Sequence, residues 1–161
     1  LKRRSSQNIV IGGAAGAMPV LVGWAAVTNE LAWAPVVMFA IIFVWTPPHF
    51  WALAIKYAED YTAADIPMLP SVMSAKQTTS RMLAYTVLLW AISLLLGPVA
   101  DLGLIYTVSA AVLGAAFLYY AVRVHKDPTM AKAMTLFTFS ITYVTLLFGA
   151  MAIDALVANG A

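Results

Sequence analysis

Residues 31–55 read LAWAPVVMFAIIFVWTPPHFWALAI and contain no Lys, Arg, Asp or Glu. An apolar run of about 20 residues is long enough to cross the hydrocarbon core of a bilayer as a helix. The backbone groups of such a run find no water in the membrane, so they must pair with one another in a helix. This stretch therefore predicts a transmembrane helix.

Four similar runs occupy most of the remaining sequence, at residues 9–27, 82–100, 102–122 and 133–157. Across the five runs, His49 and Asp154 are the only acidic or imidazole side chains, and Lys and Arg do not occur. Hydrophobic residues make up 63% of the chain and charged residues 10%, whereas soluble domains carry roughly 25% charged residues. The sequence therefore predicts an all-α polytopic membrane protein with five transmembrane helices.

The basic residues fall on alternate links between these runs, so they gather on one side of the predicted membrane. They are Lys2, Arg3, Arg4, Lys56, Lys76, Arg81, Arg123, Lys126 and Lys132. Because cytoplasmic loops collect Lys and Arg, we expect the N-terminus and the 56–81 loop to be cytoplasmic and the C-terminus to be external, in the plasma membrane. The net charge of +2 is too small to indicate a nucleic acid, and the absence of cysteine excludes disulfides and thiol catalysis.

Small residues four apart predict close helix packing at two places. Gly12 and Gly16 share one helix face, and so do Ala110 and Gly114. Such pairs let a second helix backbone approach closely in a membrane.

The pair Pro47-Pro48 removes two backbone donors from the second run. We expect the helix to kink or break there, beside a cavity near its cytoplasmic end. If the helix continues, His49, Lys56 and Asp60 share one face. An ionisable side chain at this depth indicates function, and a His49 satisfied by a neighbouring group is the equal alternative.

Glu59 and Asp60 are expected at the C-terminal end of that helix, where the macrodipole disfavours carboxylates by about 0.3 to 1 kcal/mol. A Mg²⁺ ion shared with a diphosphate would hold them there. The alternative is a Lys56–Asp60 ion pair worth roughly 0.2 to 0.5 kcal/mol. Asp65 is expected to be a turn residue, and His125 a solvated loop residue.

The basic cluster Lys2-Arg3-Arg4 has two interpretations. It is typical of an anchor that sets membrane topology. Guanidinium groups also suit the oxygens of a diphosphate.

At these residues the sequence resembles the UbiA-type intramembrane prenyltransferases, and among them the branch that modifies haem. The matching segments are 1–4 and 7–17, WTPPHFWAL at 45–53, Asp60-Tyr61 and Pro67-Met68-Leu69-Pro70. They cover about the first 70 residues. The last three runs fit the family by topology only.

The resemblance implies nine helices around a central cavity, with Mg²⁺ and two acidic motifs binding an isoprenoid diphosphate. Residues 1–161 would be the C-terminal part of a single transmembrane prenyltransferase domain, supplying helices five to nine. Because the first acidic motif has no counterpart and the chain starts with Leu1, we expect a missing N-terminal half. The implied reaction transfers the farnesyl group of farnesyl diphosphate to a vinyl group of haem b, giving haem O and diphosphate.

The resemblance also implies roles for individual residues. Glu59 and Asp60 would form the second acidic motif, as catalytic residues and Mg²⁺ ligands, and His49 would be catalytic, near the haem vinyl group or the iron. Lys56 stands where quinone-pathway relatives carry another acid, which departs from the pattern. The residues that would bind substrate are Lys2, Arg3, Arg4, Asn8, Lys56 and Tyr61.

Three other functions stay open from the residues alone. A transporter would use broken helices with polar sites near the membrane midplane. A non-catalytic haem-binding subunit would use His49 and His125. A quinone-pathway prenyltransferase would share the fold.

Overall fold

The computed structural model describes residue 5 and residues 7–158. This part of the chain is all-α, as predicted, and five of its helices are long and apolar enough to cross a membrane. The helices are α1 (Asn8–Thr28), α2 (Trp33–Lys56), α3 (Ala58–Ala63), α4 (Leu69–Val72), α5 (Ala75–Val99), α6 (Leu104–Lys126) and α7 (Met130–Ala158). The five predicted runs correspond to α1, α2, α5, α6 and α7.

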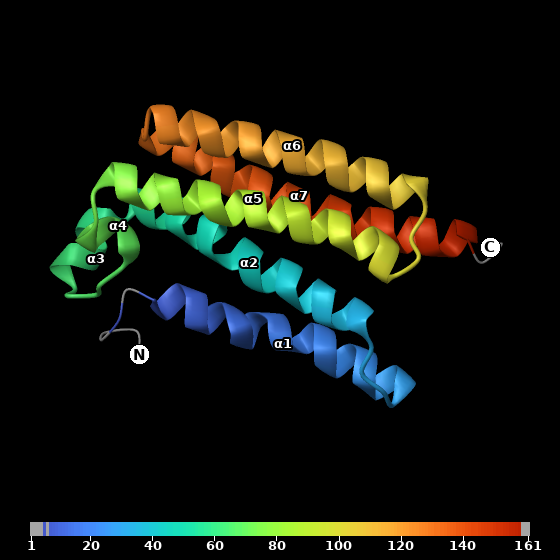
Figure 1. Ribbon diagram of the computed structural model, residues 1–161. Coiled ribbons are helices and arrows are strands. Elements are labelled where there is room, and N and C mark those ends of the chain that lie inside the picture. The colour runs from blue at the N-terminus through green and yellow to red at the C-terminus, as the bar shows by residue number, and fades with distance from the viewer. Residues whose placement is uncertain (1–4, 6, 159–161) are drawn as a thin grey trace.

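Four of the long helices form a ring (Figure 1). Helix α2 packs against α5 and α7, and α6 packs against the same two helices, so α2 and α6 lie diagonally opposite. Among the helices of the described chain, α1 packs against α2 only and stands at the edge. The α3–α4 segment and the α6–α7 link lie at one end of the bundle, while the α1–α2 and α5–α6 links lie at the other.

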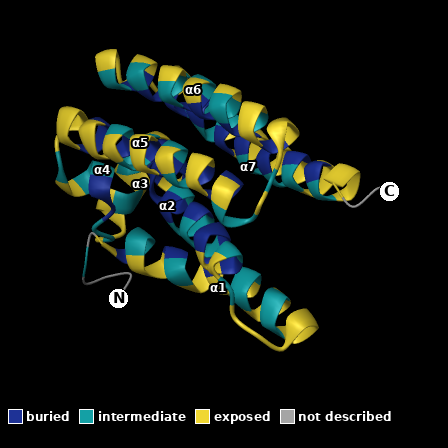
Figure 2. Cartoon of the chain, turned by 45° about the vertical axis from the view of Figure 1, so that its right-hand side comes forward, coloured by how far each residue is buried: buried dark blue, intermediate teal, exposed yellow. Residues whose placement is uncertain are grey.

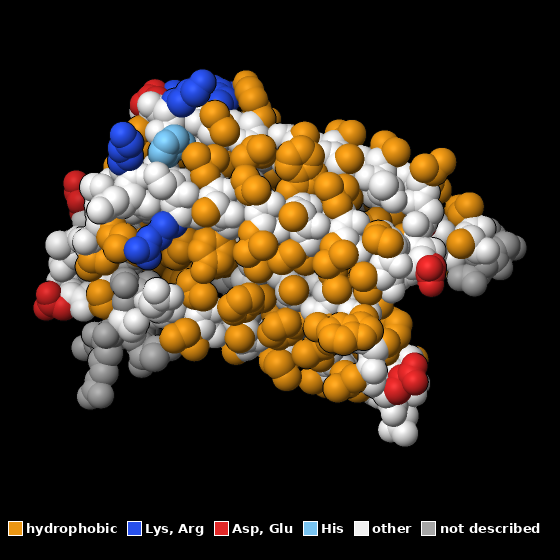
Figure 3. Space-filling view, viewed as in Figure 1, with side chains coloured by type: hydrophobic (Ala, Val, Ile, Leu, Met, Phe, Trp, Pro, Cys, Tyr) orange, Lys and Arg blue, Asp and Glu red, His pale blue; other side chains and the backbone are white. Residues whose placement is uncertain are grey.

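The core lies inside this ring (Figure 2). Of the five long helices, α2 is buried most extensively, because it packs against three of the others. The largest fully buried side chains include Trp51, Tyr106, Phe117, Tyr143 and Ile41. Figure 3 shows apolar side chains covering the outer face between two ends that carry the charged groups. This band matches the surface of a helix bundle that faces lipid.

The predicted close packing is confirmed on α6. Ala110 and Gly114 are both buried there, and a Cβ atom added to Gly114 would lie 1.9 Å from Cδ1 of Trp90. Glycine is therefore what lets the Trp90 indole of α5 approach the α6 backbone.

The prediction for α1 is wrong by one residue. Gly12 and Gly16 have nothing within 4 Å of an added Cβ atom. Gly13 and Ala17 are buried instead, and the Cβ position of Gly13 lies 3.1 Å from Thr46. The run of small residues offers two adjacent faces, and the packing against α2 decides which is used.

Of the kink or break predicted at Pro47-Pro48, the break is wrong, because α2 continues through both prolines to Lys56. The fixed proline φ is compatible with a helix, and neighbouring helices can stabilise a membrane helix that lacks some backbone bonds. Both proline rings are buried in the bundle. The chain turns at Tyr57 instead, so Asp60 is not on one continuous helix with His49 and Lys56.

Candidate functional site

Glu59 and Asp60 lie in the first turn of α3, and both are exposed. The expectation that they end the second helix is therefore wrong. At a helix start, free backbone N–H groups and the positive end of the macrodipole favour carboxylates. The dipole penalty inferred from the sequence does not exist, so it gives no reason for a metal.

The alternative Lys56–Asp60 ion pair is absent too. Among residues 5 and 7–158, the only salt bridge joins Lys132 to Asp127. The Lys56 ammonium group instead lies over the ring of Tyr57, 5.1 Å from its centroid. Both carboxylates of α3 are thus left without a cationic side-chain partner in the described part of the chain.

Two open hollows lie beside α3. The larger, of about 510 Å³, is lined by Ala58, Glu59, Thr62, Ala63, Pro70 and Ser71. The smaller, of about 250 Å³, is lined by Tyr61, Thr62, Asp65, Ile66, Pro67, Ser71 and Val72. Thr62 and Ser71 line both. The predicted substrate-binding Tyr61 and the predicted metal ligand Glu59 therefore each face a hollow at the same end of the bundle.

The segment that carries these hollows is fixed by local bonds. Asp65 adopts a positive φ of 51°, and its N–H donates to the Thr62 carbonyl at 3.2 Å. The prediction of a turn residue is confirmed. Met68 and Leu69 are buried, so they anchor the segment to the bundle and hold α3 at its end.

The donor set can be tested against a divalent cation. No group of three or more His, Asp or Glu side chains within the described residues is placed to hold a metal ion. Mg²⁺ is usually held by one or two carboxylates together with substrate phosphates. Glu59 and Asp60 fit that open kind of site, in which the substrate completes the coordination, and they do not fit a closed protein site.

His49 lies apart from the acids, in the seam between α2 and α7. Its Nδ1 lies 2.6 Å from Oγ of Ser140. Its ring stacks on Trp45, with centroids 4.2 Å apart, and on Phe137, with centroids 4.6 Å apart. Sequence reasoning missed Phe137 and Ser140 because they are about 90 residues from His49 and no local pattern links them.

Of the predicted substrate-binding residues at the start of the chain, the structure describes Asn8 but not the basic cluster at residues 2–4. Asn8 is the first residue of α1 and is buried, and its N–H donates to the Ser5 carbonyl at 3.2 Å. Lys2, Arg3 and Arg4 lie outside the described residues.

The prediction that His125 is a solvated loop residue is wrong. It belongs to the last turn of α6, and its Nδ1 lies 3.0 Å from Oγ1 of Thr79. It is therefore a half-buried helix residue and not a solvated loop residue.

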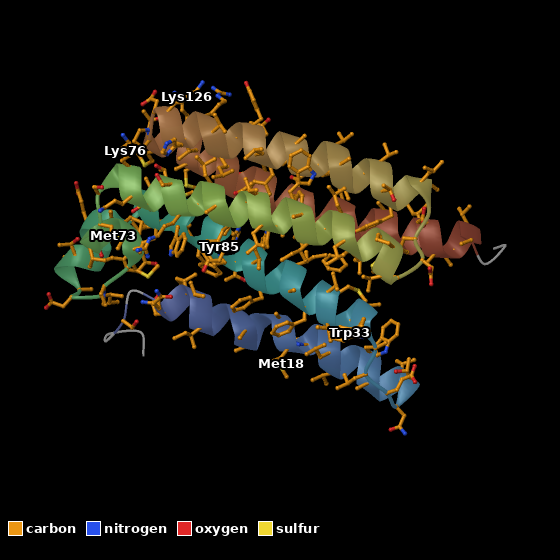
Figure 4. All side chains as sticks on the ribbon, viewed as in Figure 1. Met18, Trp33, Met73, Lys76, Tyr85 and Lys126 are labelled. Carbon is orange, nitrogen blue, oxygen red and sulfur yellow. The ribbon has the colours of Figure 1, made fainter. Side chains whose placement is uncertain are left out.

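Basic side chains gather at the end of the bundle that carries α3. Figure 3 shows blue side chains over this end of the visible face, and Figure 4 labels Lys76 and Lys126 there. The basic residues that the sequence predicts on one side of the membrane thus lie at one end of the folded bundle. The candidate site and the cationic groups share one end.

Comparison with known proteins adds a family. Residues 1–152 match the model of the UbiA prenyltransferase family. The chain is 55% identical over 159 residues to the protoheme IX farnesyltransferase of Parafrankia sp. (strain EAN1pec), covering 97% of this chain and 51% of that protein. It is 55% identical over 156 residues to the protein of the same name from Synechococcus sp. (strain JA-2-3B'a(2-13)), covering 96% and 47%. The chain spans about half the length of the curated relatives it matches, and no solved structure matches it.

Proposed function

The chain belongs to the UbiA prenyltransferase family, and on that premise we propose that it takes part in transferring the farnesyl group of farnesyl diphosphate to a vinyl group of haem b. The products are haem O and diphosphate. The observation that carries the proposal is the identity of 53 to 55% over nearly the whole chain to proteins named protoheme IX farnesyltransferase. The exposed Glu59, which lines a hollow at the end of a membrane bundle, and the exposed Asp60 next to it on α3 support it.

The proposed reaction breaks the bond between the allylic carbon and the diphosphate oxygen. A carbon–carbon bond then forms with the haem vinyl group, and water adds to the resulting cation and releases a proton, which leaves the hydroxyl group of haem O. Negative charge builds up on the departing diphosphate, so groups that stabilise it accelerate the step. Bound Mg²⁺ would neutralise part of this charge.

Glu59 and Asp60 are the residues that would hold Mg²⁺, because they present two exposed carboxylates on one short helix. Lys56 ends α2 immediately before that helix and offers a cation at the same end. Tyr61 lines the neighbouring hollow. The apolar helices of the bundle, next to this end, would keep water from the allylic carbon until it reacts.

We also propose that this end of the bundle is cytoplasmic. The basic residues of the described chain lie on the links and helix ends of that side, as the positive-inside rule requires of cytoplasmic loops. The continuity of α2 gives no support to the transporter alternative, which would use broken helices.

Asp60→Asn tests the role of the acids. We expect haem O formation by the complete gene product in membranes to fall on the order of 100-fold, the loss typical of removing one electrostatic group from a transition state. Glu30→Gln is the matched control, because Glu30 is an exposed acid in the α1–α2 link at the opposite end. Unchanged turnover with Asp60→Asn would refute the metal-binding role of this residue.

A further inference from the structure

The hydrogen bonds around Ser140 determine which nitrogen of His49 carries a proton. The Ser140 hydroxyl donates to the Phe137 carbonyl at 2.6 Å. A hydroxyl has one proton to donate, so Oγ must act as the acceptor in its 2.6 Å contact with Nδ1 of His49. The proton in that contact therefore belongs to Nδ1.

The other ring nitrogen is then the basic one. Within the described part of the chain, the hydrogen bond and aromatic ring contacts of His49 are with Trp45, Phe50, Phe137 and Ser140, none of which is charged. Charged groups are costly inside a membrane span, so nothing here favours a second proton. In a neutral imidazole with Nδ1 protonated, Nε2 carries the lone pair.

The ring is also held against rotation. Trp45 and Phe137 cover its two faces at interplanar angles of 19° and 23°. Trp45 is fixed in turn, because its Nε1–H donates to the carbonyl of Ser140 at 2.8 Å. Nε2 has no hydrogen-bond partner among the described residues, and the His49 side chain retains 8% exposure. Nε2 is thus the ring nitrogen that the described residues leave without a partner.

We propose that Ser140 is a positioning residue that fixes His49 with its proton on Nδ1, so that Nε2 is presented as a ligand to the iron of the haem substrate. A neutral imidazole nitrogen is a common axial ligand of haem iron. A hydrogen bond from the opposite nitrogen is the usual device that sets the tautomer and orients such a ligand. The ligand role rests on the proposed function, which makes haem a substrate, whereas the tautomer does not.

The tautomer is tested by nitrogen NMR of the complete gene product, labelled with ¹⁵N-histidine, in detergent and without haem. His49→Gln assigns the signal. We expect a proton on Nδ1 in the wild type, retention of that tautomer in Ser140→Thr, and a shift of population towards Nε2–H in Ser140→Ala. A wild-type signal with the proton on Nε2 would overturn the proposal without need of any variant.

The ligand role is tested by titrating the protein with ferric haem b and recording visible and electron paramagnetic resonance spectra. We expect a histidine-ligated signal that His49→Gln abolishes and that Ser140→Ala weakens by about 10- to 100-fold in affinity. His125→Gln is the matched control, because His125 is also hydrogen-bonded through Nδ1 to a hydroxyl group, and it should leave the signal unchanged.

Failure of the ligand role of His49 and failure of the proposed farnesyl transfer give different experimental results. A haem spectrum that does not depend on His49 overturns the ligand role, even in a protein that makes haem O. A spectrum that depends on His49 in a protein that makes no haem O supports the ligand role and counts against farnesyl transfer.

Discussion

At the scale of single residues, Gly114 has the least room for a side chain among the glycines that the structure describes. The Trp90 indole occupies the space that any side chain at this position would need. Gly12 lies on another membrane helix and faces open space. The two glycines thus have the same sequence environment of small apolar neighbours and opposite packing.

Gly114→Ala should destabilise the bundle by about 1 to 3 kcal/mol, the usual cost of forcing extra volume into a packed core. The thermal unfolding temperature of the detergent-solubilised protein measures this effect. Gly12→Ala serves as the control and should not lower that temperature, since its new methyl group meets nothing within 4 Å. Equal losses in both variants would mean that the α5–α6 contact is not the cause.

At the scale of an element, Asp154 explains how α6 begins. This acid of α7 is 4% exposed, and its carboxylate accepts hydrogen bonds from the backbone N–H groups of Gly103 and Tyr106. No side chain of the α5–α6 link itself caps the helix. An acidic residue within a membrane span is therefore used here as a helix cap supplied by a different helix.

Asp154→Ala should free both N–H groups and cost roughly 1 to 3 kcal/mol for each donor that stays buried without a partner. We expect faster hydrogen exchange in the first turn of α6, measured by mass spectrometry, with the α3–α4 segment unaffected. Asp101→Asn is the control, because Asp101 is an exposed acid of the same link at a positive φ that Asn tolerates. Protection of the α6 start that survives in Asp154→Ala would contradict the cap.

At the scale of the whole molecule, the bundle has two chemically different ends. One carries α3, both hollows and the basic side chains, and the other carries the α1–α2 and α5–α6 links. Within the described chain, helix α1 packs against α2 alone, and most of the surface of α1 is left uncovered.

Orientation in the membrane can be measured with single cysteines, because this sequence contains none. In cysteine-free protein, Thr62→Cys should react with a membrane-impermeant thiol reagent only from the cytoplasmic side. Glu30→Cys should react only from outside. Both positions are exposed, so labelling with the reverse pattern would refute the proposed orientation.

Most of the fold could be predicted from local sequence. Long apolar runs and the placement of Lys and Arg act on each segment separately, because the membrane selects helices and charge selects a side. The starts of helices were predicted less well. Helix α5 begins at Ala75, seven residues before the apolar run at 82, because Ser74 and Gln77 form a capping box there.

The site was predicted only in part. Glu59 and Tyr61 do lie beside hollows, but the acids begin a new helix at a turn that the sequence did not indicate. For the same reason His49 and Asp60, which the sequence placed on one face, belong to different elements.

The sequence by itself determined that this chain forms five membrane helices with the cationic groups and acidic pair at one end, since these properties depend on composition within each segment. Only the tertiary structure decided which pair of small residues contacts a neighbour, that α2 passes unbroken through Pro47-Pro48, and that His49 is held by Ser140. The contacts of the small residues and of His49 depend on how each helix is rotated about its axis, and the continuity of α2 depends on the helices packed around it. Packing with helices distant in the sequence sets that rotation, and no local pattern encodes it.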